Sequence, residues 1–200
     1  MKKLLIATNN PGKFREYKEI FKKLKLPIKL TSLKELKIKE KVEENGKTFK
    51  ENAVIKARFF SKLSGFPTLS DDAGIEIDYL KGEPGVKSRR WLGYELTDEE
   101  IINTALKKLE GVPKRKRSAK LRAVIGLIFP PSKKVYTFEG ILKGFVAEKP
   151  IKKRVNGYPF RSIFMPSGSK KHLGQLSIIA HRKKAVEKSL PIIKKYLCLI

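Results

Sequence analysis

The chain has little of what disulfide-linked, secreted or membrane-spanning proteins require. Its 200 residues include one cysteine, Cys198, so an internal disulfide cannot form. The N-terminal apolar run, residues 4–8, is shorter than the core of a signal peptide. No apolar stretch of the sequence has the length that a membrane-spanning helix needs. We therefore expect a cytoplasmic protein with no membrane partner.

Acidic residues are scarce in the second half of the chain, which contains no aspartate. Residues 101–200 hold 24 of the 46 Lys and Arg residues but only 4 of the 20 Asp and Glu residues. The formal net charge of +26 should attract polyanions, such as nucleotides, nucleic acid or anionic lipid surfaces. A lysine-rich surface is also typical of some heat-adapted proteins. A metal site built from several carboxylates must draw mainly on residues 1–100.

The remaining composition is typical of a packed globular protein, with 40% hydrophobic residues. We predict a single domain over residues 1–200, with two lobes. Apolar periodicity and turn residues predict strands at 4–7, 28–31, 68–70, 75–80, 121–129 and 135–142, and helices at 13–24, 48–63, 97–110 and from 181 onward. This alternation predicts an α/β protein with a mixed sheet.

Local signals mark the expected ends of these elements. Thr48 and Thr97 each precede a glutamate by three residues, which is the capping-box pattern at the start of a helix. Residues 71–74 are expected to form a turn between two short strands. Pro191 should kink or end the last helix.

The segment 8–13, Thr-Asn-Asn-Pro-Gly-Lys, lies where the first predicted strand meets the first predicted helix. Ligands of open α/β sheets bind at the carboxyl ends of strands, and a helix N-terminus offers N–H groups to phosphate. Lys13 adds a positive charge in the first helical turn. The segment lacks the longer glycine loop of a Walker motif. A phosphate-binding loop and a plain turn both fit this segment.

Two adjacent carboxylates, Asp71 and Asp72, follow an apolar segment. Such a pair suits a hard cation with oxygen ligands, which can neutralise phosphate oxygens and ready a water for attack. An acidic turn is the alternative. The apolar neighbours Leu69 and Ile75 argue that these acids lie near the core, where unpaired carboxylates are costly.

Two further segments contain charged side chains suited to the same ligand. Glu43 precedes the second predicted helix and could give a second carboxylate to the ion at Asp72. Lys56 lies one turn beyond Asn52 on that helix, and it could reach a phosphate or simply face solvent. At the start of the last helix, Arg182 is a forked donor suited to phosphate or a base edge, and the alternative is a basic surface.

The order and spacing of these motifs resemble the inosine triphosphate pyrophosphatase family. The matching segments are TNNPGK at 8–13, ENGKTFKENAVIKA at 44–57, SDDAGIEID at 70–78, GEPGVKSRRW at 82–91 and AHRKKA at 180–185. Members of this family hydrolyse non-standard purine nucleoside triphosphates, such as ITP, dITP and XTP, to a monophosphate and pyrophosphate. The resemblance implies an elongated mixed β-sheet with flanking helices, two lobes and a central cleft, and usually a homodimer.

The resemblance also implies roles for individual residues. Asp72 corresponds to the catalytic carboxylate, which binds Mg²⁺ and activates water, and Glu43 to a second magnesium ligand. The implied substrate-binding residues are Thr8, Asn9, Asn10, Lys13, Lys56, Ala73, Arg90, Tyr158, Phe160, His181 and Arg182. Those of the 8–13 loop, with Lys56, would hold the triphosphate. The two aromatic residues and the pair His181–Arg182 would contact the base.

Ala73 stands where the family usually has a serine. The other departures from the family pattern lie in the part that recognises the base. Pro159 replaces the usual glycine, Arg161 the usual aspartate, and Leu176 the usual lysine. The metal and phosphate residues are unchanged. We therefore hypothesise that the chemistry is retained and the base preference altered.

Two alternatives belong to other classes of function. The basic second half, with its aromatic residues, could bind nucleic acid. A diverged family member could instead bind nucleotides without hydrolysing them. The nucleic-acid interpretation leaves the acidic segment 70–74 and Glu43 unexplained.

Overall fold

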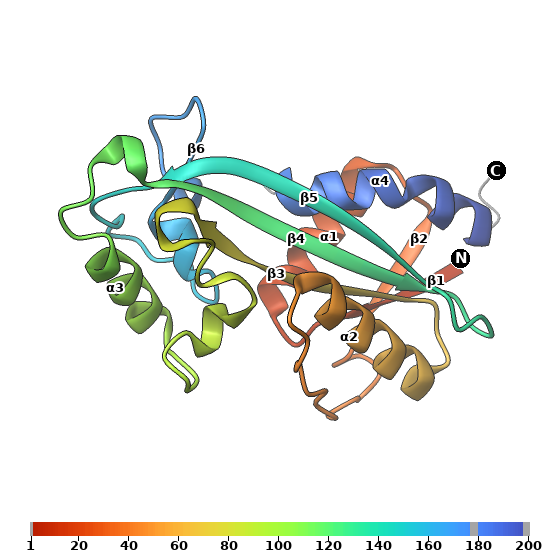
Figure 1. Cartoon of the computed structure of the whole chain (residues 1–200). Helices are drawn as coiled ribbons and strands as arrows, with labels where there is room; N and C mark the ends of the chain where they lie inside the picture. The colour runs from red at the N-terminus through yellow and green to blue at the C-terminus, as the bar shows by residue number, and fades with distance from the viewer. Residues whose placement is uncertain (1, 177–179, 198–200) are drawn as a thin grey trace. The chain divides into compact units, whose positions relative to one another are not determined.

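A computed structural model describes residues 2–176 and 180–197 (Figure 1). Within them, a six-stranded sheet has the strand order β2-β1-β3-β4-β5-β6. The strands are β1 (Lys2–Ala7), β2 (Ile28–Ser32), β3 (Thr68–Ile77), β4 (Ser118–Ile128), β5 (Val135–Val146) and β6 (Phe164–Pro166). β1 pairs in parallel with β2 and β3, whereas β5 and β6 are antiparallel. The predicted mixed sheet is therefore confirmed.

Four α-helices are present in the described residues: α1 (Pro11–Lys23), α2 (Phe49–Ser64), α3 (Asp98–Lys108) and α4 (Ala180–Leu197). The Asn10 side chain caps α1 by accepting hydrogen bonds from the backbone N–H groups of Gly12 and Lys13. Thr97 starts α3 with the predicted capping box. At α2 only half of that motif forms, because Glu51 accepts from the Lys47 N–H instead of returning to Thr48.

The chain forms two compact units. The first contains the described residues of Met1–Asp72, Ala123–Gly140 and His181–Ile200. The second contains those of Ala73–Arg122 and Ile141–Ala180. The predicted number of domains and the predicted cleft stay predictions.

The core of the first unit forms around β1. Residues 4–7 of this strand are buried at every position, as expected for a parallel strand covered on both faces. Helix α1 packs Tyr17, Ile20 and Phe21 inward at helical spacing. Figure 1 shows α2 and α4 on opposite sides of the strands of this unit.

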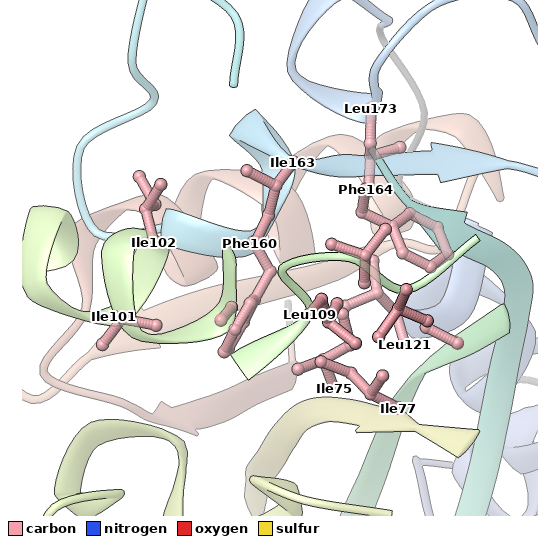
Figure 2. Packing of buried hydrophobic residues seen from close by; sticks show 14 of the residues in the cluster. Ile75, Ile77, Ile101, Ile102, Leu109, Leu121, Phe160, Ile163, Phe164 and Leu173 are labelled. Carbon is pink, nitrogen blue, oxygen red and sulfur yellow. The ribbon is translucent and has the colours of Figure 1, made fainter. Parts of the chain in front are cut away.

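The second unit has a core of its own, shown in Figure 2. Ile75 and Ile77 of β3, Ile101 of α3 and Phe164 of β6 are fully buried in it. These apolar side chains come from three separate stretches of the chain, and burial of their surface stabilises the unit.

One local prediction is wrong. Residues 71–74 lie inside β3 rather than in a turn, because the sheet continues through them and both carboxylates find buried partners. Helix α4 continues past Pro191 to Leu197, so this proline does not end the helix, and the alternative of a kink stays a prediction. Cys198 lies outside the described residues. Within those residues, no helix has the length and apolarity needed to cross a membrane.

Candidate active site

The candidate site lies in the first unit, at one edge of the parallel strands. Ala7 at the end of β1 is the register partner of Ser70 in β3. The residues that follow each of them, the 8–10 loop and Asp71–Asp72, therefore reach the same edge of the sheet. Helix α2 approaches this edge closely. The Ser70 hydroxyl donates to the carbonyl of Ala53 (2.6 Å), and a Cβ on Gly126 would lie 2.8 Å from that same oxygen.

Asp71 is the centre of a buried ion network. Its carboxylate accepts hydrogen bonds from the Lys13 ammonium, from the Tyr17 hydroxyl (3.0 Å) and from Arg182 Nε (2.9 Å). Arg182 also donates to Glu16 (2.8 Å). Side chains of α1 and α4 are thus joined to β3 through one carboxylate, whose side chain is only 1% exposed.

The charges around Asp71 keep it ionised. Burial alone would raise the pKa of this carboxyl, but Arg182 and Lys13 hold the pKa well below its usual range. Burial, followed by the charge of Asp71, raises the pKa of Tyr17 well above its ordinary value, so the phenol stays protonated and donates. With three donors and a depressed pKa, Asp71 is suited to hold structure and unsuited to accept a proton.

Asp72 points to the other face of the sheet, as successive strand residues do. Its Oδ2 accepts a hydrogen bond from the Asn52 side chain (3.2 Å), and its Oδ1 accepts from Lys56 Nζ (3.3 Å). Lys56 also donates to Glu44 (2.6 Å). The Asp72 side chain is 12% exposed and that of Glu44 is 36% exposed. One ammonium is therefore shared between two partly accessible carboxylates.

The pKa of Asp72 is shifted in the opposite direction from that of Asp71. Burial raises the pKa of the Asp72 carboxyl, and Glu44 and Asp71 add to the shift, although Lys56 and Lys13 oppose it. Burial alone would lower the pKa of Lys56, but Asp72 and Glu44 raise it, so the ammonium stays charged. Of the two adjacent aspartates, Asp72 is the more basic and the more exposed, which suits a general base.

Asn52 connects the two carboxylate-bearing segments. Its side-chain oxygen accepts a hydrogen bond from the Gly46 N–H (2.8 Å), while its NH₂ group donates to Asp72. A Cβ on Gly46 would lie 2.6 Å from that oxygen, so the close approach requires glycine. The loop that carries Glu44 is thereby held beside Asp72.

The segment 8–13, predicted to be a phosphate loop or a plain turn, lies at the end of β1 as expected, and several of its donors are already occupied. Asn10 uses the N–H groups of Gly12 and Lys13 to cap α1, and the Thr8 hydroxyl accepts from the Asn10 N–H (3.2 Å). Asn9 is exposed at the tip. The Lys13 ammonium pairs with Asp71, so a phosphate would have to draw it away from that carboxylate.

The structure brings Glu44, rather than the predicted Glu43, into the cluster. Glu43 is exposed, whereas Glu44 shares the Lys56 ammonium with Asp72. In an extended segment, neighbouring side chains point in opposite directions, so only one of two adjacent glutamates can face α2. Glu43 lies outside this cluster, and its role as a magnesium ligand stays a prediction.

His181 and Arg182 lie in the buried first turn of α4, so the alternative of a basic surface is wrong for this pair. The turn packs closely on β5, because any side chain at Gly140 would meet the His181 carbonyl oxygen. Arg182 is occupied by Asp71 and Glu16. Its guanidinium therefore holds the first unit together in this structure.

The other predicted contacts belong to the second unit. Phe160 is 8% exposed within the hydrophobic core of this unit (Figure 2), and its contact with a base stays a prediction. The guanidinium of Arg161 lies over the ring of Tyr158, 5.1 Å from its centroid. Ala73 belongs to β3, and Arg90 is an exposed residue at the end of the 3₁₀ turn Gly85–Arg90.

Several residues that complete the site had no role predicted from the sequence. These are Glu16, Tyr17, Glu44 and Asn52. Asp71 was predicted to share a cation with Asp72, but it holds the buried ion network instead. The two carboxylates separate because adjacent residues of a strand point to opposite faces.

The donor set fits magnesium although it is small. The described residues contain no group of three or more His, Cys, Asp and Glu side chains arranged for a metal. Magnesium usually takes one or two protein carboxylates together with water and substrate phosphates. Glu44 and Asp72 already share one positive charge through Lys56, so this pair accommodates a cation between its carboxylates.

Comparison with known proteins identifies the family. The model of the Ham1 family matches residues 4–192. The chain belongs to the Ham1 family. It is 40% identical to a dITP/XTP pyrophosphatase of Caldanaerobacter subterraneus over 98% of both chains. It is 37% identical to a dITP/XTP pyrophosphatase of Bacillus licheniformis, over 94% of this chain and 96% of that protein.

Solved structures of the Ham1 family have the same fold. A HAM1 protein from Coxiella burnetii matches with a TM-score of 0.82 and 32% identity, over 98% of this chain and 100% of that chain. The Staphylococcus aureus Ham1 protein matches with a TM-score of 0.79 and 31% identity, over 97% and 99% of the two chains. The resemblance inferred from the motifs and the α/β class are confirmed.

Proposed function

We propose that this chain hydrolyses non-standard purine nucleoside triphosphates to a nucleoside monophosphate and pyrophosphate. Near full-length similarity to relatives named dITP/XTP pyrophosphatase supports this activity. Asp72 carries the proposal, because it is a partly exposed, basic carboxylate that Asn52 and Lys56 orient beside the phosphate loop. A nucleotide-pool house-cleaning role follows from such an activity.

The positive groups of the first unit account for triphosphate binding. Lys13 and Lys56 each pair with a carboxylate, and a triphosphate offers them oxygens of higher charge. The N-terminus of α1 adds the positive end of its dipole. These groups stabilise the charge that develops on the pyrophosphate leaving group.

Asp72 acts on the water in this mechanism. Its carboxylate takes a proton as the water oxygen attacks the α-phosphorus. The bond from that phosphorus to the bridging oxygen breaks, and pyrophosphate leaves with the oxygen. Asn52 holds the Oδ2 atom of Asp72 by its hydrogen bond and so fixes the direction of the other lone pairs.

Glu44 and Asp72 would hold Mg²⁺ when the substrate is present. Bound there, the ion would neutralise phosphate oxygens and lower the pKa of a coordinated water. Glu44 takes the role first assigned to Glu43, because Glu44 shares Lys56 with Asp72.

The base preference is proposed to differ from that of the relatives. The Tyr158 ring lies under Arg161, where the family pattern has an aspartate, and Phe160 is buried. For a base to stack on the Tyr158 ring, the Arg161 guanidinium that covers the ring would have to move away. The homodimer and the cytoplasmic location stay predictions.

Pyrophosphate release from a panel of ITP, dITP, XTP, ATP and GTP tests the activity. We expect release that requires magnesium and stops with a chelator. The ranking of the five substrates reports the base preference, and the usual preference for ITP and XTP would contradict its alteration. If none of the five nucleotides releases pyrophosphate, the proposed hydrolysis is excluded, and a family member that only binds nucleotides is favoured.

A further inference from the structure

A pocket of about 580 Å³ lies in the second unit, beside the end of α3. This volume is in the range of small-molecule sites. Its lining residues are Leu106, Lys107, Leu109, Glu110, Gly111, Val112, Pro113, Arg117 and Glu148. None of them belongs to the Asp71 or Asp72 clusters, so the proposed hydrolysis leaves this pocket unused.

The apolar wall of the pocket is part of the core. Leu109 and Val112 belong to the buried cluster of the second unit, in which Figure 2 labels Leu109. Between them Gly111 has a φ of 70°, a left-handed conformation that favours glycine and turns the chain. The Val112 N–H donates to the Leu109 carbonyl (3.1 Å) and closes that turn. The wall is therefore held in place before any ligand arrives.

Arg117 is a buried charge in this wall. The residue is 4% exposed. Its N–H donates to the Lys114 carbonyl (3.1 Å) and its carbonyl accepts from the Val146 N–H (2.9 Å), so the backbone is fixed on both sides. Its guanidinium makes no hydrogen bond and no ion pair with any residue in the described part of the chain, and its Nε is fully buried. Burial lowers the pKa of Arg117, and the charge of Glu148 in the same pocket opposes this only in part. A buried guanidinium without a hydrogen-bond partner is costly.

We propose that this pocket binds a small organic anion, with a carboxylate or phosphate group on Arg117 and an apolar body on the wall of Leu106, Leu109, Val112 and Pro113. A guanidinium is a planar fork of donors that matches either group with two parallel hydrogen bonds. The ligand would accept hydrogen bonds from the terminal nitrogens of Arg117, which have no partner among the described residues, whereas the buried Nε lies out of its reach.

The surrounding charges favour one small anion over a long polyanion. Exposed basic residues follow the pocket at Lys114–Lys116 and attract anions to it. Glu110 and Glu148, both exposed, line the pocket itself and repel anions, and a strand with many phosphates meets more of this repulsion than one anionic group held by Arg117. The Arg117 site thus takes a single anionic group.

Calorimetric titration of the full chain with three matched probes tests the chemistry. The probes are phenylacetate, phenyl phosphate and the uncharged phenylacetamide. We expect at least one of the two anions to bind and the amide to bind about 10- to 100-fold more weakly, the factor of a hydrogen bond to a charged group. The anion that binds more tightly shows whether the site takes a carboxylate or a phosphate group. Absence of binding by both anions, or equal binding of the amide, would overturn the proposal.

Two neighbouring substitutions locate the site. Arg117→Met should fold and weaken anion binding about 10- to 100-fold. Arg115→Met removes an exposed charge that only attracts anions from solution, so it should weaken binding by no more than about twofold. Both variants should keep the pyrophosphatase activity, which separates this proposal from the proposed function. Undiminished anion binding by Arg117→Met would refute it.

The stability of Arg117→Met distinguishes a ligand site from a structural arginine. Because the guanidinium has no hydrogen-bond partner among the described residues, an apolar side chain of similar length should leave the melting temperature equal or higher. If the variant does not fold, Arg117→Lys decides. It keeps the charge and loses the fork, so anion affinity should fall about tenfold. Unchanged affinity in Arg117→Lys would then overturn the proposal.

Discussion

Asp71 and Asp72 offer a matched pair of substitutions with opposite expected effects. Asp71→Asn removes the charge that Lys13 and Arg182 both contact, and the Arg182 side chain is only 4% exposed. Removing one partner of a buried ion pair costs about 3–5 kcal/mol, because the other charges stay buried. For a chain of this size, about 1 kcal/mol lowers the melting temperature by roughly 2–4 °C. The expected fall is therefore about 6–20 °C.

Asp72→Asn should affect turnover instead. Burial raises the pKa of the Asp72 carboxyl, so its ionised form is unfavourable in the folded chain, and an uncharged amide removes that cost. Lys56 retains Glu44 as a partner. We expect an unchanged or higher melting temperature, and loss of pyrophosphate release because asparagine cannot accept the proton of the water.

The pH dependence of stability separates the two aspartates further. The folded pKa of Asp71 is below its unfolded value of about 3.9, so its stabilisation is complete above that pH and is lost as the pH falls towards the folded value. The difference in melting temperature between the parent chain and Asp71→Asn should therefore shrink below about pH 4.

Thermal unfolding followed by circular dichroism, with pyrophosphate release on the same samples, measures both effects. Equal melting temperatures for the parent chain and Asp71→Asn at pH 7 would refute the buried network. Turnover by Asp72→Asn at the parent rate would refute the assignment of the base.

Three further predictions concern the carboxylate cluster. Glu44→Gln should raise the magnesium concentration for half-maximal activity at least about tenfold, whereas Glu43→Gln, at an exposed neighbour, should not change it. If Glu43→Gln raises it and Glu44→Gln does not, Glu43 is the magnesium ligand. Asn52→Ala should lower kcat about 10- to 100-fold while the chain stays folded, and an unchanged kcat would show that Asp72 needs no orientation. The value of kcat/KM should fall as the pH drops below the pKa of Asp72, which lies above about 3.9 because burial raises it. Asn52→Ala should raise this pKa further, because it removes a donor to the ionised carboxylate. A profile that is flat down to pH 4 would exclude Asp72 as the base.

Much of the local structure was predictable because it depends on neighbours in the sequence. The capping box at Thr97 needs only a glutamate three residues later, and it forms as predicted. The strand β4, the turn after it and the strand β5 also follow from alternation and turn residues. The motif order alone identified the family, which the comparisons confirmed.

The partners of the charged side chains were decided by the tertiary structure. Arg182 meets Glu16 across 166 positions of the chain and Asp71 across 111, and no local pattern specifies such a pair. The burial of Phe160 depends on packing among several distant elements. Only the tertiary structure decides these contacts, because each needs a partner that lies far away in the sequence.

The sequence by itself determined the α/β class, the family and the residue types of the site. It selected Asp72 as the catalytic acid only through the family resemblance and gave no physical reason for the difference between the two adjacent acids. Asp71 and Asp72 have the same local sequence, but a strand turns them to opposite faces, where α1 and α4 supply three donors to the first and α2 supplies two to the second. Burial and neighbouring charge then shift their pKa values in opposite directions, and both quantities exist only in the folded chain.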